Sequence, residues 1–74
     1  MLIRTAGNII PNAKNRAPYI QANDALALMD FLIEAGNDVQ TAYEIAARGL
    51  QLDDGGEYWV ARYYSEKKGI EIAM

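Results

Sequence analysis

Residues 49–64, GLQLDDGGEYWVARYY, decide the fold, because they predict either a β-hairpin or the end of one helix and the start of another. The pair Asp54 and Gly55 is favoured in type I′ hairpin turns, and β-prone tyrosine, tryptophan and valine follow it. These residues do not alternate between apolar and polar types, however, as a half-buried strand would. The sequence therefore favours a helix over residues 55–68 and leaves a hairpin as the alternative.

Capping and charge signals support this third helix. Asp54 and Glu57 have the spacing of a capping box, in which side chains satisfy the free backbone N–H groups at a helix start. Arg62 and Glu66 form an oppositely charged pair about one helical turn apart. We therefore expect the N-cap of this helix at Asp53 or Asp54.

The first helix is expected over residues 24–35. Asn23 is a favoured N-cap residue, and Gly36 suits the position just after a helix end. The polar face is narrow, because Asp30 and Glu34 are the charged residues that follow the first turn. A surface helix typically buries an apolar stripe only somewhat wider than roughly 100°. This helix therefore lies at the centre of the fold or exposes surplus apolar surface.

The second helix is expected over residues 38–48. Asn37 and Gln40 have the spacing of a capping box, and Gly49 suits the position after the last turn. Apolar residues recur at helical spacing along one face of this segment. We expect one core, shared by the three helices, that contains Leu28, Leu32, Ile45, Trp59 and Tyr63.

The N-terminal segment, residues 1–22, differs from the rest of the chain in charge and local structure. Pro11 and Pro18 favour extended backbone before them and the asparagines favour turns, so we expect no helix before residue 22. The segment carries three bases and no acid, whereas residues 23–74 carry four bases and ten acids. We therefore expect a basic extended arm that packs on an acidic helical body.

The expected fold class is mainly α, a three-helix domain with an extended N-terminal arm. A single domain spans residues 1–74, with the arm, a helical body over residues 23–69 and a tail over residues 70–74. The tail, IEIAM, alternates in polarity and could form a minor strand pair with the N-terminal residues. With 74 residues and no cysteine, the chain supports one small core without disulfides.

The composition argues against an enzyme. The chain has no His, no Cys, one Ser and two Thr, so nucleophile–base catalysis and zinc binding lose nearly all their residues. The run DDGGE, residues 53–57, lacks the ligand spacing of an EF-hand loop, so we expect helix capping there, with no metal and no cofactor. No run of about 18 apolar residues occurs, so we expect no membrane span and a cytoplasmic location.

We expect a non-enzymatic, protein-binding regulator or inhibitor that docks on a larger protein or complex. The transcription machinery is one candidate, because surfaces that hold nucleic acid are basic and the helical body is acidic. The alternative is a nucleic-acid-binding protein that uses the basic arm or a degenerate helix-turn-helix. Carboxylates at the start of the third helix would repel phosphates, which weakens this alternative. A homo-oligomer held through the first helix is a further option.

Arginine and tyrosine are among the residues that most often dominate interface energies, and an arm can order on a partner without disturbing the core. On the third helix, Tyr58 is expected on an exposed flank, whereas Trp59 and Tyr63 are assigned to the core. The predicted partner-binding residues are Arg4, Lys14, Arg16, Tyr58 and Arg62.

Overall fold

Three α-helices follow one another along the chain in a computed structural model of the protein, which describes residues 16–74. They are α2 (Pro18–Glu34), α3 (Val39–Leu50) and α4 (Asp54–Tyr63), and a π-helical turn, η2 (Tyr64–Lys68), continues α4. The described part of the chain contains no strand. The fold is therefore mainly helical, as predicted. Residues 1–15 of the expected arm, which was assigned to residues 1–22, lie outside the described residues.

Helix α2 begins at Pro18, so the prediction that no helix starts before residue 22 is wrong. Proline suits the first position of a helix, because its missing N–H would have no intrahelical partner there and its φ is already helical. The carbonyl of Ala17, the N-cap residue, accepts hydrogen bonds from the N–H groups of Ile20 and Gln21. Asn23, the predicted N-cap, is an exposed residue inside the helix.

Three consecutive residues between α2 and α3, Gly36, Asn37 and Asp38, end one helix and start the next. Helix α2 ends as predicted before Gly36, whose φ of +113° is a conformation that glycine adopts readily. The side chain of Asn37 donates to the carbonyl of Leu32 at 2.9 Å, so it caps the end of α2 and not the start of α3. Asp38 is the N-cap of α3, and its carboxylate accepts from the backbone N–H of Thr41 at 2.8 Å.

Helix α3 continues through Gly49 to Leu50, so the predicted end at residue 48 is wrong. Gln51 adopts the left-handed conformation that commonly ends a helix, with φ 57° and ψ 56°. Leu50 is buried, and the N–H of Leu52 donates to the carbonyl of Ala47 at 3.0 Å. Burial of Leu50 explains why the helix continues past the glycine.

Helix α4 confirms the helical interpretation of residues 55–68, and the hairpin alternative is wrong. Asp53 occupies the predicted N-cap position, but its side chain makes no capping hydrogen bond to α4. The wider turn of η2 ends at Gly69, which has φ 68°, and the N–H of Ile70 donates to the carbonyl of Tyr64 at 3.0 Å. The tail, residues 70–74, is not a strand, and the N-terminal residues that were expected to pair with it lie outside the described residues.

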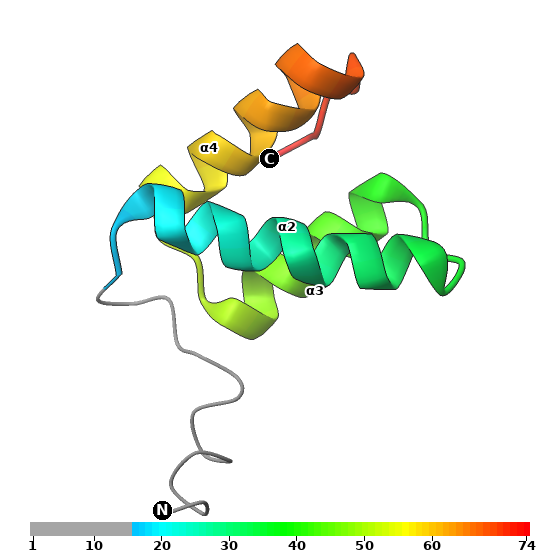
Figure 1. The fold of residues 1–74 in the computed structure, drawn as a ribbon, viewed down its shortest axis with the longest axis horizontal. Helices are drawn as coiled ribbons and strands as arrows, with labels where there is room; N and C mark the ends of the chain where they lie inside the picture. Colours follow the sequence, from blue (N-terminus) through cyan, green and yellow to red (C-terminus); the bar gives the residue numbers. More distant parts are fainter. Residues whose placement is uncertain (1–15) are drawn as a thin grey trace, which may run out of the picture.

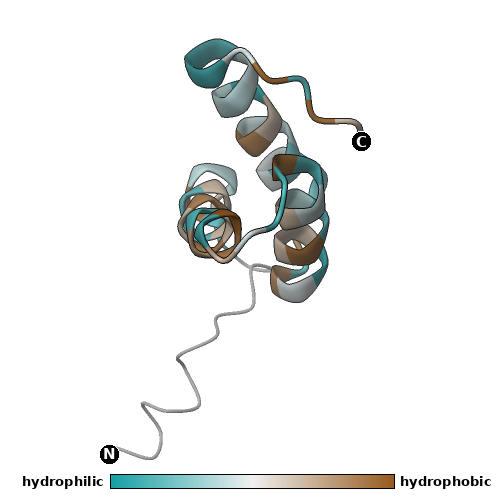
Figure 2. Ribbon diagram, turned by 90° about the vertical axis from the view of Figure 1, so that its right-hand side faces the viewer, coloured by the Kyte–Doolittle hydropathy of each residue, from teal (hydrophilic) through white to brown (hydrophobic). Residues whose placement is uncertain are grey.

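Helix α2 occupies the centre of the arrangement. It packs against both α3 and α4, whereas α3 and α4 contact each other little (Figure 1). Hydrophobic residues, drawn in brown, occur on both α2 and α3, and the far end of η2 is hydrophilic (Figure 2). The large apolar circumference of α2 follows from this central position, because two of its sides are covered.

The core is built from small residues and a few large ones. Predicted core residues Leu28 and Leu32 are partly buried and pack against it, but Ile45, Trp59 and Tyr63 are exposed. The buried row is instead Gly56 and Val60 on α4 and Tyr64 at the start of η2, which are spaced by four residues. The buried hydrophobic residues are Ala22, Ala25, Met29, Ala42, Tyr43, Ala46, Leu50, Val60, Tyr64 and Ile72.

A buried glutamine fixes the start of α4 against the start of α2. Gln21 is only 1% exposed, and its side-chain amide donates to the Asp53 carboxylate at 3.2 Å while its oxygen accepts from the Asp53 N–H at 3.0 Å. A Cβ on Gly56 would lie 2.3 Å from that oxygen, and one on Gly55 would lie 3.0 Å from Pro18. The two glycines therefore allow the helix ends to approach closely.

The C-terminal tail runs back from η2 and connects α4 with α3. Ile72 is buried in the core. The side chain of Gln40 on α3 donates to the carbonyl of Ala73 at 2.9 Å and accepts from its N–H at 3.0 Å. Gln40 thus binds the tail backbone through both polar atoms of its amide, instead of capping α3 as predicted.

Candidate functional site: an aromatic face on helix α4

Three aromatic side chains are exposed on α4: Tyr58 is 52% exposed, Trp59 42% and Tyr63 37%. Residues four apart lie above one another on a helix, so the exposed side chains form two adjacent rows. Trp59, Arg62, Tyr63, Glu66 and Lys67 together line a shallow hollow on this side of the helix. We call the two rows the α4 face: Asp54, Tyr58, Arg62 and Glu66 in the first, and Trp59, Tyr63 and Lys67 in the second.

Arg62 lies at the centre of the α4 face and is held by three neighbours. Its Nε donates to the Glu66 carboxylate at 2.8 Å, and an Nη donates to the Tyr58 hydroxyl at 3.3 Å. Its guanidinium carbon lies 5.3 Å from the centre of the Trp59 ring, which is within the range of a cation–π contact. The hydrogen bond to Glu66, followed by that to Tyr58, raises the pKa of Arg62 above its ordinary value.

The aromatic rings hold one another in edge-on arrangements. Tyr58 and Trp59 have ring centres 5.5 Å apart at an interplanar angle of 78°, and Tyr63 meets the buried Tyr64 at 5.5 Å and 84°. Such geometry is favourable because the positive ring edge meets the negative ring face. The exposed rings are therefore held in place before any partner binds.

The structure brings together two of the five predicted binding residues. Tyr58 and Arg62 are hydrogen-bonded to each other, and both are exposed. Arg16 lies before α2, where its guanidinium is 3.3 Å from the carboxylate of Asp24. Arg4 and Lys14 lie outside the described residues. On the described residues the α4 face is therefore the strongest candidate site.

Sequence reasoning missed Trp59 and Tyr63 as surface residues. The sequence did contain one signal, the row of Gly56, Val60 and Tyr64. The small side of this row, a glycine and a valine, suits close contact with another helix. If that row faces the core, Trp59 and Tyr63 face solvent. Residue size alone had suggested the opposite, since large aromatic side chains usually contribute most to a small core.

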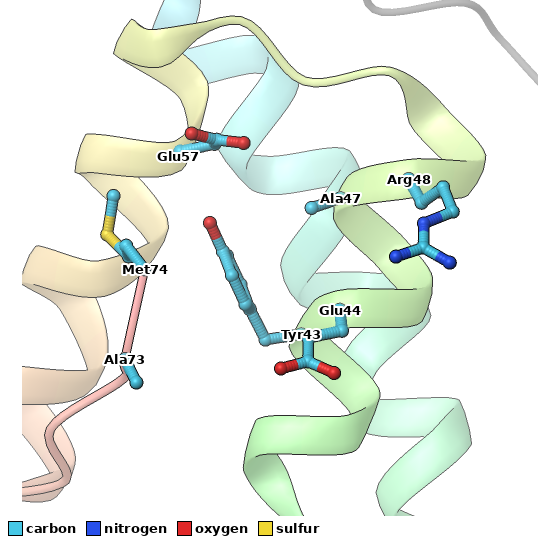
Figure 3. Close-up of a pocket in the computed structure, with 7 residues that line it drawn as sticks. All are labelled: Tyr43, Glu44, Ala47, Arg48, Glu57, Ala73 and Met74. Carbon is cyan, nitrogen blue, oxygen red and sulfur yellow. The ribbon is translucent and has the colours of Figure 1, made fainter.

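An open pocket lies between α3, α4 and the tail. The Tyr43 ring points into the space between the two helices towards Glu57 (Figure 3). Burial, and then the nearby carboxylates of Glu57 and Glu44, raise the pKa of the Tyr43 hydroxyl. The pocket offers no nucleophile–base pair, and within residues 16–74 no group of three His, Cys, Asp or Glu side chains could hold a metal ion. It is lined by Tyr43, Glu44, Ala47, Arg48, Glu57, Ala73 and Met74.

Comparison of the chain with protein families, with curated proteins and with solved structures found no match. Among the described residues, no helix has both the length and the apolar character needed to cross a membrane. The described residues thus form a small helical fold that exposes aromatic side chains on α4.

Proposed function

We propose that this protein is a non-enzymatic, protein-binding regulator or inhibitor that docks on a larger protein or complex through the α4 face. The observation that supports the proposal best is the exposed cluster of Tyr58, Trp59 and Tyr63 around Arg62, whose guanidinium is already held by Tyr58 and Glu66. Trp, Tyr and Arg are the side chains most often found to dominate binding energy at protein interfaces.

Preorganisation supports the same proposal. Binding normally costs about 0.5–1.5 kcal/mol for each flexible side chain that becomes ordered. The rings of Tyr58 and Trp59 contact each other, and Arg62 lies over Trp59, so part of this ordering is already present in the free protein. A partner would therefore gain apolar contact area at a reduced entropic cost.

The chain's acidic balance, ten acids against seven bases, suits a partner with a basic surface. Proteins of the transcription machinery carry such surfaces where they hold nucleic acid, so they are the first partner class to test. The alternative, a nucleic-acid-binding protein, is less well supported. The helix after the α3–α4 turn begins with Asp53, Asp54 and Glu57, and these carboxylates would face phosphates if α4 entered a groove.

The proposal is tested by affinity capture from the native cell extract with the wild-type protein and with Trp59→Ala. We expect Trp59→Ala to lose at least about tenfold in capture, since truncation of a central aromatic anchor commonly costs more than 1.4 kcal/mol. Phe31→Ala is the matched control, because Phe31 is an exposed aromatic residue on α2, 68% exposed. Equal capture by Trp59→Ala and the wild type, with loss in Phe31→Ala, would transfer the docking surface to α2.

A further inference from the structure

The two rows of the α4 face are complementary to each other when one helix is reversed. The first row reads acid, tyrosine, arginine, acid along Asp54, Tyr58, Arg62 and Glu66. The second row, read backwards, is lysine, tyrosine and tryptophan, along Lys67, Tyr63 and Trp59. Three pairs result, Asp54 with Lys67, Tyr58 with Tyr63, and Arg62 with Trp59. Each pair has its midpoint between residues 60 and 61.

We propose that a second copy of this chain occupies the α4 face, with the two α4 helices antiparallel and related by a two-fold axis that crosses the α4 face at the level between residues 60 and 61. The inference goes beyond the proposed function, because self-association occupies the same α4 face and would compete there with the larger partner. A two-fold interface requires a self-complementary patch, in which residue i contacts residue j and residue j contacts residue i.

The antiparallel arrangement places side chains that attract each other on opposite copies. Asp54 lies opposite Lys67 of the second copy, and Trp59 lies opposite Arg62, which extends the cation–π contact already present within one chain. Tyr58 lies opposite Tyr63. Glu66 stays paired with Arg62 of its own chain.

The α2 surface does not offer the same complementarity. Its exposed apolar residues include Phe31, which made a homo-oligomer through this helix conceivable. However, the charged side chains of α2 are Asp24, Asp30 and Glu34, and all three are acidic. Antiparallel pairing of two α2 helices would therefore bring like charges together, which is unfavourable. Charge complementarity thus favours α4 over α2.

Charge reversal provides a specific test. In Asp54→Lys the new lysine faces Lys67 in both halves of the dimer, and in Lys67→Asp two carboxylates face each other. We expect each single variant to raise the dissociation constant of self-association about tenfold or more relative to wild type, by sedimentation equilibrium. A mixture of the two variants pairs every lysine with a carboxylate, so we expect a heterodimer that forms as readily as the wild-type dimer.

The heterodimer is observed through the single tryptophan. The indole N–H resonance of Trp59 in ¹⁵N-labelled Asp54→Lys should shift when unlabelled Lys67→Asp is added, and should not shift when more unlabelled Asp54→Lys is added. Lys68→Asp is the matched control, because Lys68 has the same charge in the same turn but does not line the hollow on the α4 face. Lys68→Asp should self-associate with the same dissociation constant as the wild type. Added to Asp54→Lys, it should shift Trp59 less than Lys67→Asp does, because one of the two pairs in that heterodimer is still lysine against lysine.

Circular dichroism of both variants checks that they fold. If Asp54→Lys does not fold, Asp54→Asn replaces it. Asp54→Asn removes the attraction to Lys67 without adding a repulsion between two lysines, so it should self-associate more weakly than the wild type. A wild-type protein that stays monomeric at its highest soluble concentration, or a mixture that behaves like either variant alone, overturns the inference. The proposed function fails separately, if Trp59→Ala captures partners from the extract as well as the wild type does.

Discussion

Gly56 lies so close to Gln21 that a side chain at this position would displace the buried amide. The amide makes three hydrogen bonds, two to Asp53 and one to the carbonyl of Arg16, and is almost completely buried. Breaking them would leave buried polar groups without partners, which is more costly than the bonds are stabilising. The position of α4 relative to α2 therefore depends on the absence of one methyl group.

We predict that Gly56→Ala destabilises the protein by about 1–3 kcal/mol, as overpacking of a closely packed site does. This loss should appear despite the higher helix propensity of alanine. Gly49→Ala is the control, because Gly49 is also a helical glycine and a Cβ there would meet nothing within 4 Å apart from its chain neighbours and the backbone of its own helix. We expect Gly49→Ala to stabilise by about 0.5–1 kcal/mol. Urea unfolding followed by Trp59 fluorescence measures both, and equal effects would contradict the prediction.

At the level of single residues, the sequence predicted residue types better than residue roles. The prediction that Asn37 is the N-cap of the second helix is wrong, because Asn37 caps the end of α2 and its neighbour Asp38 caps the start of α3. Both residues are good caps, so sequence spacing alone could not distinguish them. Gln40 was assigned to a capping box, and the tail residue it binds lies 33 positions away in the chain.

At the level of the helices, the signals near each terminus predicted the existence of all three. The boundaries were less predictable where tertiary contacts determine them. Helix α3 passes Gly49 because Leu50 is buried, and this contact is not visible in the local sequence. The start of α2 at Pro18 has a local signal, since proline favours the first helical position, but the sequence analysis interpreted this proline as favouring extended backbone. The N-cap of α3, in contrast, is a purely local interaction.

We predict a pH-dependent contribution from Asp38 to the stability of α3. The hydrogen bonds from the backbone and side chain of Thr41 lower the pKa of Asp38 below its ordinary value of 3.8. A lowered folded-state pKa means that the contribution is complete well above pH 3.8 and is lost as the pH falls through the lower, folded-state value. Asp38→Ala should therefore have a lower Tm than the wild type at pH 7, and the difference should decrease as the solution is acidified below pH 3.8.

Asp38→Asn is the control for this prediction, because asparagine caps helices well but does not titrate. Its Tm difference from Asp38→Ala should be retained as the pH falls. Thermal unfolding of the three proteins between neutral and acidic pH provides the measurement. A constant difference between the wild type and Asp38→Ala across this range would show that the carboxylate charge does not contribute.

At the level of the whole molecule, the sequence predicted the fold class but not which side of α4 faces the core. Each side of α4 carries aromatic residues, so hydrophobicity alone could not select one of them. The selection follows from the close approach of Gly55 and Gly56 to α2, which places Val60 and Tyr64 inside and Trp59 and Tyr63 outside. The sequence therefore predicted only Tyr58 and Arg62 of the α4 face. Trp59 and Tyr63 were missed because the side of α4 that faces the core was not known.

The C-terminal tail contacts both α3 and α4, which otherwise contact each other little. Ile72 is buried and lines a hollow beside Ala61 and Arg62 of α4, while the next residue is bound by Gln40 of α3. Ile70, in the same tail, is more exposed. The tail should therefore stabilise the relative position of the two helices through one side chain and one backbone unit.

We predict that Ile72→Ala destabilises the protein by about 1–3 kcal/mol. Interior isoleucine truncations cost about 2–5 kcal/mol, and a segment near the chain end loses less because it can fray. Ile70→Ala, the matched control, should cost less than Ile72→Ala, because its side chain buries less apolar surface.

Hydrogen exchange distinguishes a local effect of Ile72→Ala on the tail from a global loss of stability. In Ile72→Ala the Ala73 N–H, which donates to Gln40, should exchange faster, while the amides of α2 keep protection proportional to the remaining global stability. Equal costs for the two variants, or an unchanged Ala73 exchange rate, would mean that α3 and α4 are positioned by α2 alone.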